Sequence, residues 1–319
     1  MDGSYMALAA SEISERGYRA LDSWAPERIA AAVVDGQAAA IAAIRPVLPA
    51  IARAAKIVAE RLAVGGRVIY VGAGSSGLIA LTDALELPGT FGLDAASVRV
   101  VIAGGVDSLS GLIAPAEDDE EAGRDAIAAL DLGSGDCVIA VAASGETPFT
   151  CAAIEAAKVA GVWCFGIANN PGTRLLRAAD VAVCLATPPE VIAGSTRLGA
   201  GTAQKCVLNA LSTLIGVELG HVYEGLMVNL KAENEKLRRR AVRIVAIAGR
   251  CDEVKAAAML SASGGDVKVA IAALRLEIPA EEARSRLSGH GRNLRRLLGG
   301  AEEETNRESV PRSAENGEG

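Results

Sequence analysis

The sequence predicts an α/β protein in which helices cover both faces of a parallel β-sheet. Short, continuous apolar segments alternate with longer segments that have the apolar spacing of helices. Continuous apolar strands are typical of a parallel sheet that is buried on both faces. Half of the 319 residues are hydrophobic, mostly small aliphatic ones, and only 3% are aromatic, which suits helices packed closely on a sheet.

The expected elements follow one another in a regular order. Residues 26–64 are Ala-rich with helical spacing, and Pro46 and Pro49 should break or kink this stretch. Strands and helices then alternate up to residue 187, and residues 198–246 are again expected to be helical. The alternating elements are expected at 67–74, 76–87, 97–105, 117–130, 136–145, 148–161, 162–170 and 179–187.

Three regions are expected along the chain. Residues 1–250 should form the α/β domain together with the N-terminal helices, and residues 251–299 should form a small helical module. Residues 300–319 are charged and poor in apolar side chains, so we expect a disordered tail.

Composition excludes several classes of function. A net charge of −7 and few aromatic residues argue against binding to nucleic acid. Six cysteines without CxxC spacing are typical of a reducing compartment, and two histidines are too few for a histidine-based metal site. We find neither a signal-peptide pattern nor an apolar stretch of roughly 18 residues. We therefore expect a cytoplasmic protein with no metal and no membrane partner.

A glycine-rich turn follows the first strand. Residues 72–77, "GAGSSG", have the GxGxxG spacing of a dinucleotide-binding turn. Such a site also needs an acidic residue at the end of the next strand, to bind the ribose. That strand ends in Gly104-Gly105, and so we expect no nucleotide cofactor.

A second turn of the same kind occurs in "VIAVAASGETP", where Ser144 follows Ser75 by 69 residues. Two turns at the carboxyl edge of one parallel sheet can converge on one ligand, and helix N-termini favour anions. Together they would hold the phosphate of a small molecule. The alternative is that their hydroxyl groups only cap helices. The expected binding residues are Gly74, Ser75, Ser76, Ser144, Gly145 and Thr147.

These turns resemble the sugar isomerase (SIS) fold, a phosphosugar-binding fold, and longer motifs extend the resemblance. "DALELPGTFG", "AASGETP", "GSTRLGAGTAQK" and "NEKLRRRAVRIV" follow the order seen in the N-acetylmuramic acid 6-phosphate etherases, relatives of the glucokinase regulatory protein. The match runs from about residue 10 to 250, and residues 251–299 are similar to the small C-terminal domain of the family. The resemblance implies an SIS-type sheet, a sugar-phosphate ligand, a homodimer and no cofactor.

The resemblance also implies a reaction. The family cleaves the D-lactyl ether of N-acetylmuramic acid 6-phosphate by elimination and water addition, giving N-acetylglucosamine 6-phosphate and D-lactate, a step in the recycling of cell-wall sugars. Glu86 matches the acid that protonates the departing lactate. Its apolar neighbours Leu85 and Leu87 should keep a proton on this carboxyl near neutral pH. The alternative is an ordinary exposed carboxylate at a helix end.

Other matched positions are expected at the ligand. Ser195, Thr196 and Arg197 would face the sugar, although Arg197 could instead brace its loop through a carboxylate. Lys205 would contact the ligand or cap the helix that begins there.

Three positions depart from the family pattern. The second family glutamate falls on Ala114, and two family arginines fall on Leu78 and Glu146. Losing a positioned base costs about 10²–10⁴-fold in rate. Glu117, Asp118 and Glu146 are candidate replacements. Two other functions therefore stay open: a non-catalytic phosphosugar-binding regulator, and an SIS isomerase in which Glu146 is the base.

Overall fold

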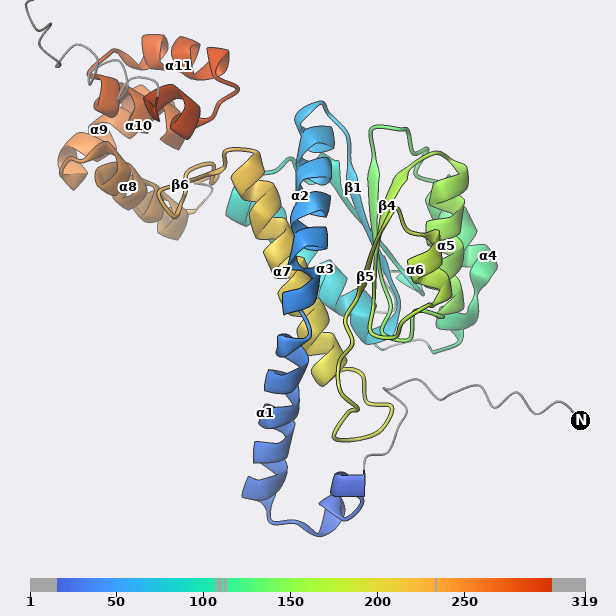
Figure 1. The fold of residues 1–319 in the computed structure, drawn as a ribbon. Helices are drawn as coiled ribbons and strands as arrows, with labels where there is room; N and C mark the ends of the chain where they lie inside the picture. Colours follow the sequence, from blue (N-terminus) through green and yellow to red (C-terminus); the bar gives the residue numbers. More distant parts are fainter. Residues whose placement is uncertain (1–15, 106, 108–110, 112–113, 233, 300–319) are drawn as a thin grey trace, which may run out of the picture. The chain divides into compact units, whose positions relative to one another are not determined.

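The computed structural model describes residues 16–299, apart from 106, 108–110, 112–113 and 233 (Figure 1). By packing, the chain divides into two compact units, one of residues up to 88 and 93–218, the other of residues 89–92 and from 219 onward. We expected this division at residue 250. It lies earlier because helix α8 (Glu235–Gly249) packs in the second unit. The expected disordered tail, 300–319, lies outside the described residues.

The first unit contains a sheet of five parallel strands, which confirms the predicted α/β class. The strand order is β2-β1-β3-β4-β5, and every neighbouring pair is parallel. The strands are β1 (Val68–Gly72), β2 (Val98–Ile102), β3 (Cys137–Val141), β4 (Trp163–Ala168) and β5 (Val181–Cys184).

Seven helices belong to the described part of this unit. They are α1 (Pro26–Ala42), α2 (Leu48–Ala63), α3 (Gly74–Phe91), α4 (Glu120–Ala128), α5 (Pro148–Val159), α6 (Arg174–Ala178) and α7 (Gly199–Glu218). Figure 1 shows α4, α5 and α6 on one side of the sheet, and α2, α3 and α7 on the other. The expected break between α1 and α2 is the 3-10 turn Arg45–Val47, which contains Pro46.

The helices α1 and α2 form a helical span, Pro26–Ala63, that is long and apolar enough to pass as a membrane segment. The core helix of a globular unit passes the same test. In α2 the buried residues Ile51, Ala54 and Val58 lie on one face, as in a helix packed on a core. In contrast, α1 leaves Val34 and Ile41 64% and 44% exposed.

Strand β1 is completely buried, and its side chains alternate between the two faces of the sheet. Ile69 and Val71 belong to the apolar cluster that includes the buried residues of α5. Tyr70 lies on the opposite face, as the two-residue period of a strand requires. Its hydroxyl donates a hydrogen bond to Asp83 of α3, 3.0 Å away.

The strands β1 and β3 end level with each other. Gly72 at the end of β1 pairs with Val141 at the end of β3. Before the two strands begin, the Asp136 carboxylate accepts hydrogen bonds from the backbone N–H (2.7 Å) and the guanidinium (2.8 Å) of Arg67. Strand order reverses between β1 and β3, and ligands of open α/β sheets bind at such a switch point, beyond the carboxyl ends of the strands.

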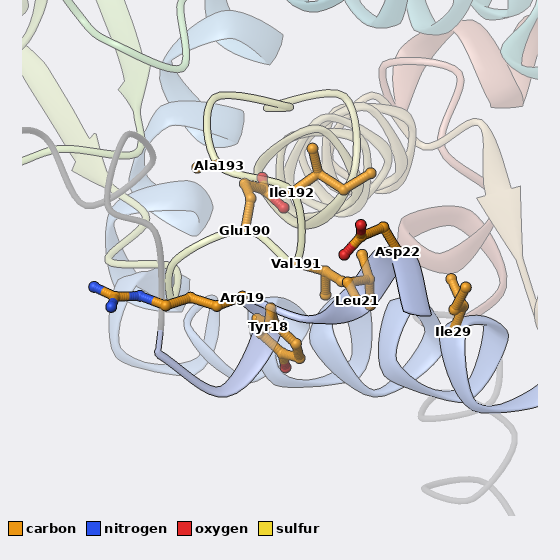
Figure 2. A pocket seen from close by; sticks show the side chains of 9 residues that line it. All are labelled: Tyr18, Arg19, Leu21, Asp22, Ile29, Glu190, Val191, Ile192 and Ala193. Carbon is orange, nitrogen blue, oxygen red and sulfur yellow. The ribbon is translucent and has the colours of Figure 1, made fainter. Parts of the chain in front are cut away.

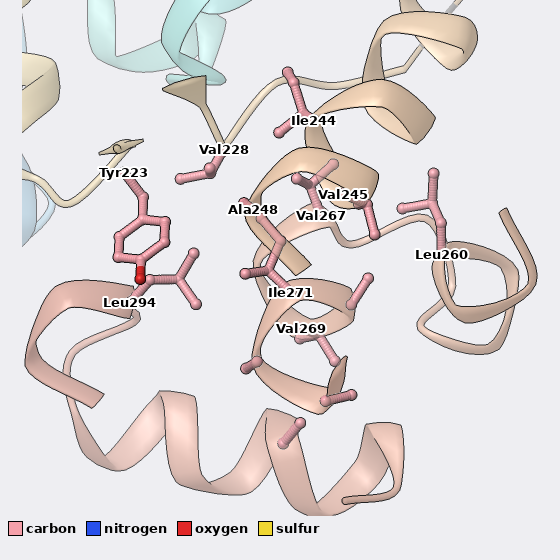
Figure 3. Close-up of a cluster of buried hydrophobic side chains, with 14 of the residues drawn as sticks. Tyr223, Val228, Ile244, Val245, Ala248, Leu260, Val267, Val269, Ile271 and Leu294 are labelled. Atoms are coloured by element: carbon pink, nitrogen blue, oxygen red, sulfur yellow. The ribbon is translucent and has the colours of Figure 1, made fainter. Parts of the chain in front are cut away.

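The second unit is a short hairpin followed by a bundle of helices around one apolar core (Figure 3). The hairpin, β6 (Val222–Tyr223) and β7 (Leu226–Met227), corrects the expected helix over 198–246. Its turn residues Glu224 and Gly225 both have positive φ, as a two-residue hairpin turn requires. After α8 come α9 (Glu253–Ala262), α10 (Val267–Leu276) and α11 (Ala280–Gly289), and residues 294–299 are helical as well.

Candidate functional site

The two predicted turns follow the neighbouring strands β1 and β3, so the sheet brings them to one edge. Each contains a glycine in the left-handed region, Gly74 with φ +51° and Gly145 with φ +72°. Gly145 is required for a second reason, since a Cβ there would lie 2.2 Å from Oγ1 of Thr173. The two turns are not equivalent, because they differ in the groups that already contact them.

The turn after β3 presents hydroxyl groups to the start of α5. Thr147 is the N-cap residue, yet its side chain makes no capping hydrogen bond. Its Oγ1 lies 3.3 Å from Oγ of the exposed Ser144, which accepts the N–H of Glu146. The alternative that these hydroxyls serve only as caps therefore does not hold at α5. Phe149 and Thr150 add first-turn N–H groups that no carbonyl of the helix can reach.

Carboxylates lie at the N-termini of the other helices that follow the strands of this sheet. Glu190 accepts the N–H groups of the first two residues of α7, both at 2.9 Å. Glu146 accepts the first N–H of α6 at 2.8 Å, and Asp119 caps α4. At α3, a Cβ added to Gly74 would lie only 2.5 Å from a carboxylate oxygen of Glu117. Among α3 to α7, α5 is therefore the helix whose N-terminus best suits an anion.

Glu146 is held on the side of the turn that faces α6. Besides the bond to the backbone of α6, the adjacent Arg174 guanidinium forms two 2.7 Å hydrogen bonds with Glu155 and also reaches Glu120. Both carboxylates raise the pKa of Arg174. In turn, hydrogen bonds from Arg174 and Arg124 hold the pKa of Glu120 at about 2. Because it accepts the backbone N–H of Arg174, the carboxylate of Glu146 is held at the start of α6 and is poorly placed to act as a base.

Ser76 takes part in a buried chain of hydrogen bonds. Its hydroxyl donates to the side-chain oxygen of Gln204 (2.9 Å), whose amide donates to Asn169 (2.9 Å). Asn169 in turn donates to Thr187 at 3.3 Å. The hydroxyl proton of Ser76 is thus used within the protein, while its neighbour Ser75 has no hydrogen-bond partner among the described side chains. Sequence reasoning did not predict that Gln204 and Asn169 would hold this turn, because both lie far from Ser76 along the chain.

Within one chain, Glu86 lies far along α3 from the turn that begins this helix. It follows Gly74 by twelve residues in α3, which is about 18 Å along the axis at 1.5 Å per residue. That length exceeds a hexose phosphate. The expected apolar surroundings are also absent in the single chain, where Glu86 is exposed and Leu85 is 68% exposed. The reason is that this side of α3 faces outward.

The buried acid of α3 is instead Asp83, three residues earlier. It accepts hydrogen bonds from Tyr70, Asn209 (2.7 Å) and Ser212 (3.1 Å). Burial raises the pKa of Asp83, and the negative charge of Glu86 raises it further. Lys205 belongs to this group as well, since its exposed ammonium donates to Asn209. Glu86 and Lys205 thus share one surface of α3 and α7, apart from the two turns.

The loop before α7 carries the remaining predicted residues. Ser195 and Thr196 are half-buried, and Arg197 is exposed with no ion pair to any described residue. The carbonyl of Thr196 accepts the N–H of Gly201, where an added Cβ would lie 3.1 Å from Ile79. The loop therefore lies beside α3, about one turn beyond Ser76.

Comparisons with known proteins show the family of this chain. Residues 38–169 match the family model of the SIS domain. The chain is 44% identical over 285 residues to the N-acetylmuramic acid 6-phosphate etherase of Deinococcus radiodurans, covering 89% of this chain and 93% of that one. The chain belongs to the N-acetylmuramic acid 6-phosphate etherase family. Enzymes of this family are carbon–oxygen lyases.

Further family members and solved structures are similar to this chain. The family member of Symbiobacterium thermophilum is 50% identical over 232 residues, covering 73% of this chain and 77% of that one. A putative phosphosugar isomerase from Bacteroides fragilis is 20% identical, with a TM-score of 0.47 over 62% of this chain and 93% of that chain.

Two of the positions that depart from the family pattern lie close to the turn between β1 and α3. Ala114 begins the 3-10 turn Ala114–Asp118, and the same turn carries Glu117 next to Gly74. Leu78 is half-buried in α3, just after the first turn. The missing family glutamate and Glu117 are thus only one 3-10 turn apart.

A separate cavity of about 320 Å³ lies between the N-terminal 3-10 turns, α1 and the loop before α7 (Figure 2). Its carboxylate Glu190 is the cap of α7, and none of the predicted binding residues lines it. Among the described residues, no three His, Cys, Asp or Glu side chains lie together as a metal site would need. The cavity lining is Tyr18, Arg19, Leu21, Asp22, Ile29 and Glu190–Ala193.

Proposed function

We propose that the protein binds N-acetylmuramic acid 6-phosphate and cleaves its D-lactyl ether, giving N-acetylglucosamine 6-phosphate and D-lactate. The supporting observation is the first turn of α5, which offers the hydroxyls of Ser144 and Thr147 and unpaired N–H groups without a carboxylate on them. We place the phosphate there. The sugar then extends toward the neighbouring turn of α3 and the loop that carries Ser195 and Thr196.

The reaction follows from the position of the ether. In the open-chain sugar the C2 proton is acidic because it lies beside the aldehyde, and the lactyl oxygen is on C3. A base removes the C2 proton, the C3–O bond breaks as lactate leaves with a proton from an acid, and water adds to C3. Each positioned acid or base contributes about 10²–10⁴-fold. We assign the acid to Glu86.

Glu86 is too far from the α5 turn of the same chain to reach a sugar phosphate bound there. It can act only on a sugar phosphate bound at the α5 turn of a second copy of the chain. We therefore propose a homodimer. Beside Lys205, a groove of about 410 Å³ is lined by Ile41 and Leu48 of α1 and α2 and by Cys206 of α7. Ile41 and Leu48 are 44% and 47% exposed, so a second copy covering them would bury apolar surface. We also propose a cytoplasmic location, which agrees with six cysteines that form no disulfide.

The test is turnover in deuterated water. The purified protein, incubated with N-acetylmuramic acid 6-phosphate, should release lactate and place deuterium at C2 of the product, as followed by NMR. Glu86→Gln should release lactate about 10²–10⁴-fold more slowly while still binding N-acetylglucosamine 6-phosphate. Glu121→Gln, an exposed acid of α4, is the control. Binding by the wild type without lactate release or exchange would instead indicate a regulator.

A further inference from the structure

One carboxyl group at the carboxyl edge of the sheet makes no hydrogen bond or ion pair with any described residue. It belongs to Glu117, at the end of the 3-10 turn after β2. The side chain is half-buried, and its Oε1 lies against Gly74 in the turn between β1 and α3. This position is next to the turn that we assign to the phosphate, because β1 and β3 are neighbours.

Apart from Asp118, which is exposed to solvent, the other carboxylates near this edge already have partners. Glu146 accepts the first N–H of α6, and Glu190 accepts two N–H groups of α7. Glu120 is paired with two arginines, and Asp83 accepts three hydrogen bonds in the interior. By contrast, Glu117 is free to exchange a proton with a ligand.

The surroundings of Glu117 also suit a base. Burial raises the pKa of Glu117, and the charge of Asp118 raises it further. A carboxylate with a raised pKa holds an abstracted proton more firmly and so removes protons more effectively. A carboxylate on the α3 turn would repel a phosphate placed there, which agrees with a phosphate on the α5 turn and the sugar carbons beside Gly74.

We propose that Glu117 is the general base that removes the C2 proton, in place of the family glutamate that Ala114 replaces. This assignment rests on the proposed function. The Glu117 carboxylate takes the proton, and the C–H electrons form the enolate of the aldehyde. The C3–O bond then breaks, and its electrons leave on lactate, which receives a proton from the acid. Water then adds to C3 and gives one proton to the acid, which restores it. Glu117, whose acidic proton exchanges with solvent, protonates C2.

The experiment compares Glu117→Gln with Glu121→Gln, which removes an exposed acid of α4. In deuterated water, Glu117→Gln should lose both C2 deuterium incorporation and lactate release by about 10²–10⁴-fold. It should still bind N-acetylglucosamine 6-phosphate, measured by calorimetry, with nearly wild-type affinity. Glu121→Gln should turn over near the wild-type rate, and Glu117→Asp should retain part of the activity. Glu86→Gln should behave differently from Glu117→Gln. It should still exchange the C2 hydrogen of the substrate for deuterium but should lose lactate release.

Two results would overturn the assignment. In the first, Glu117→Gln exchanges deuterium at C2 at the wild-type rate. In the second, it loses binding of the sugar phosphate in step with activity, which would make Glu117 a binding or structural residue. If a folded wild-type protein neither bound the sugar phosphate nor released lactate, the proposed function itself would fail, and that outcome is distinct from the other two.

Discussion

Gly145 is constrained from two directions at once. Its φ of +72° is costly for any residue with a Cβ, and its Cα faces the side chain of Thr173. Its carbonyl accepts the N–H of Leu175 in α6 at 3.0 Å. The conformation of the phosphate turn therefore depends on how α6 packs, and a change at this one residue should be felt by the ligand.

Gly145→Ala should destabilise the protein by about 1–3 kcal/mol, because the new methyl group meets Thr173 in a left-handed conformation. It should also weaken binding of N-acetylglucosamine 6-phosphate, since the hydroxyls of Ser144 and Thr147 would be displaced. Urea unfolding and calorimetric titration measure the two effects. Gly133→Ala is the matched control, with no atom within 4 Å of the added carbon and no positive φ. Equal behaviour of the two variants would contradict the constraint.

At the scale of secondary-structure elements, buried charge has opposite consequences in the two units. In the first unit, Glu190 is 5% exposed, but two N–H groups of α7 and the helix dipole compensate its charge. In the second unit, α10 buries seven consecutive residues, Val267–Ala273, and one of them is Lys268. Its ammonium is bonded to no described residue. Burial and the positive charge of Arg292 lower the pKa of Lys268 to about 8, against a smaller opposing effect of Asp266.

Lys268→Met should raise the unfolding free energy at pH 7 by about 1–3 kcal/mol, because it removes an uncompensated buried charge. The wild type should gain stability as pH rises from about 8 to 10.5, since over that range the unfolded chain binds a proton that the folded chain does not. This gain should disappear in Lys268→Met. Urea unfolding across this pH range measures it, and Lys255→Met, on α9, is the exposed control. A variant less stable than the wild type would contradict the prediction.

On the scale of the whole molecule, the predicted site residues fall into two groups that one chain cannot join. Ser144 and Thr147 lie at the switch point of the sheet. Glu86 lies about three turns along α3, and Lys205 lies about two turns along α7, both on the outer surface. A symmetric pair of chains could place the outer group of one protomer over the turns of the other.

Mixing two inactive variants tests this arrangement. The Glu86→Gln chain has an intact phosphate turn, and the Thr147→Val chain has an intact acid. If the acid of one chain acts on the ligand of the other, each mixed dimer contains one complete site. After unfolding and refolding together, the mixture should recover about a quarter of the wild-type activity, as expected for random pairing in a symmetric dimer. Each variant refolded alone should remain inactive. No recovery in mixtures shown by mass to contain mixed dimers would contradict action across the interface.

Local patterns in the sequence sufficed for the parallel sheet, the break at Pro46 and the two glycine-rich turns at its edge. Strand and helix periodicity and the rigid φ of proline depend on near neighbours, and glycines after an apolar strand are a local signal of a turn. The hairpin at 222–227 was missed because its strands are too short to show a period.

Only the tertiary structure decided which polar groups remain available to a ligand. Ser76 was expected at the phosphate, yet its hydroxyl is bonded to Gln204, 128 residues away. Glu146 and Glu190 look alike as acids in loops, and both prove to hold helix N-termini, whereas Glu117 is left unpaired beside Gly74. A hydrogen-bond partner is chosen by proximity in the fold, which the local pattern of residues does not encode.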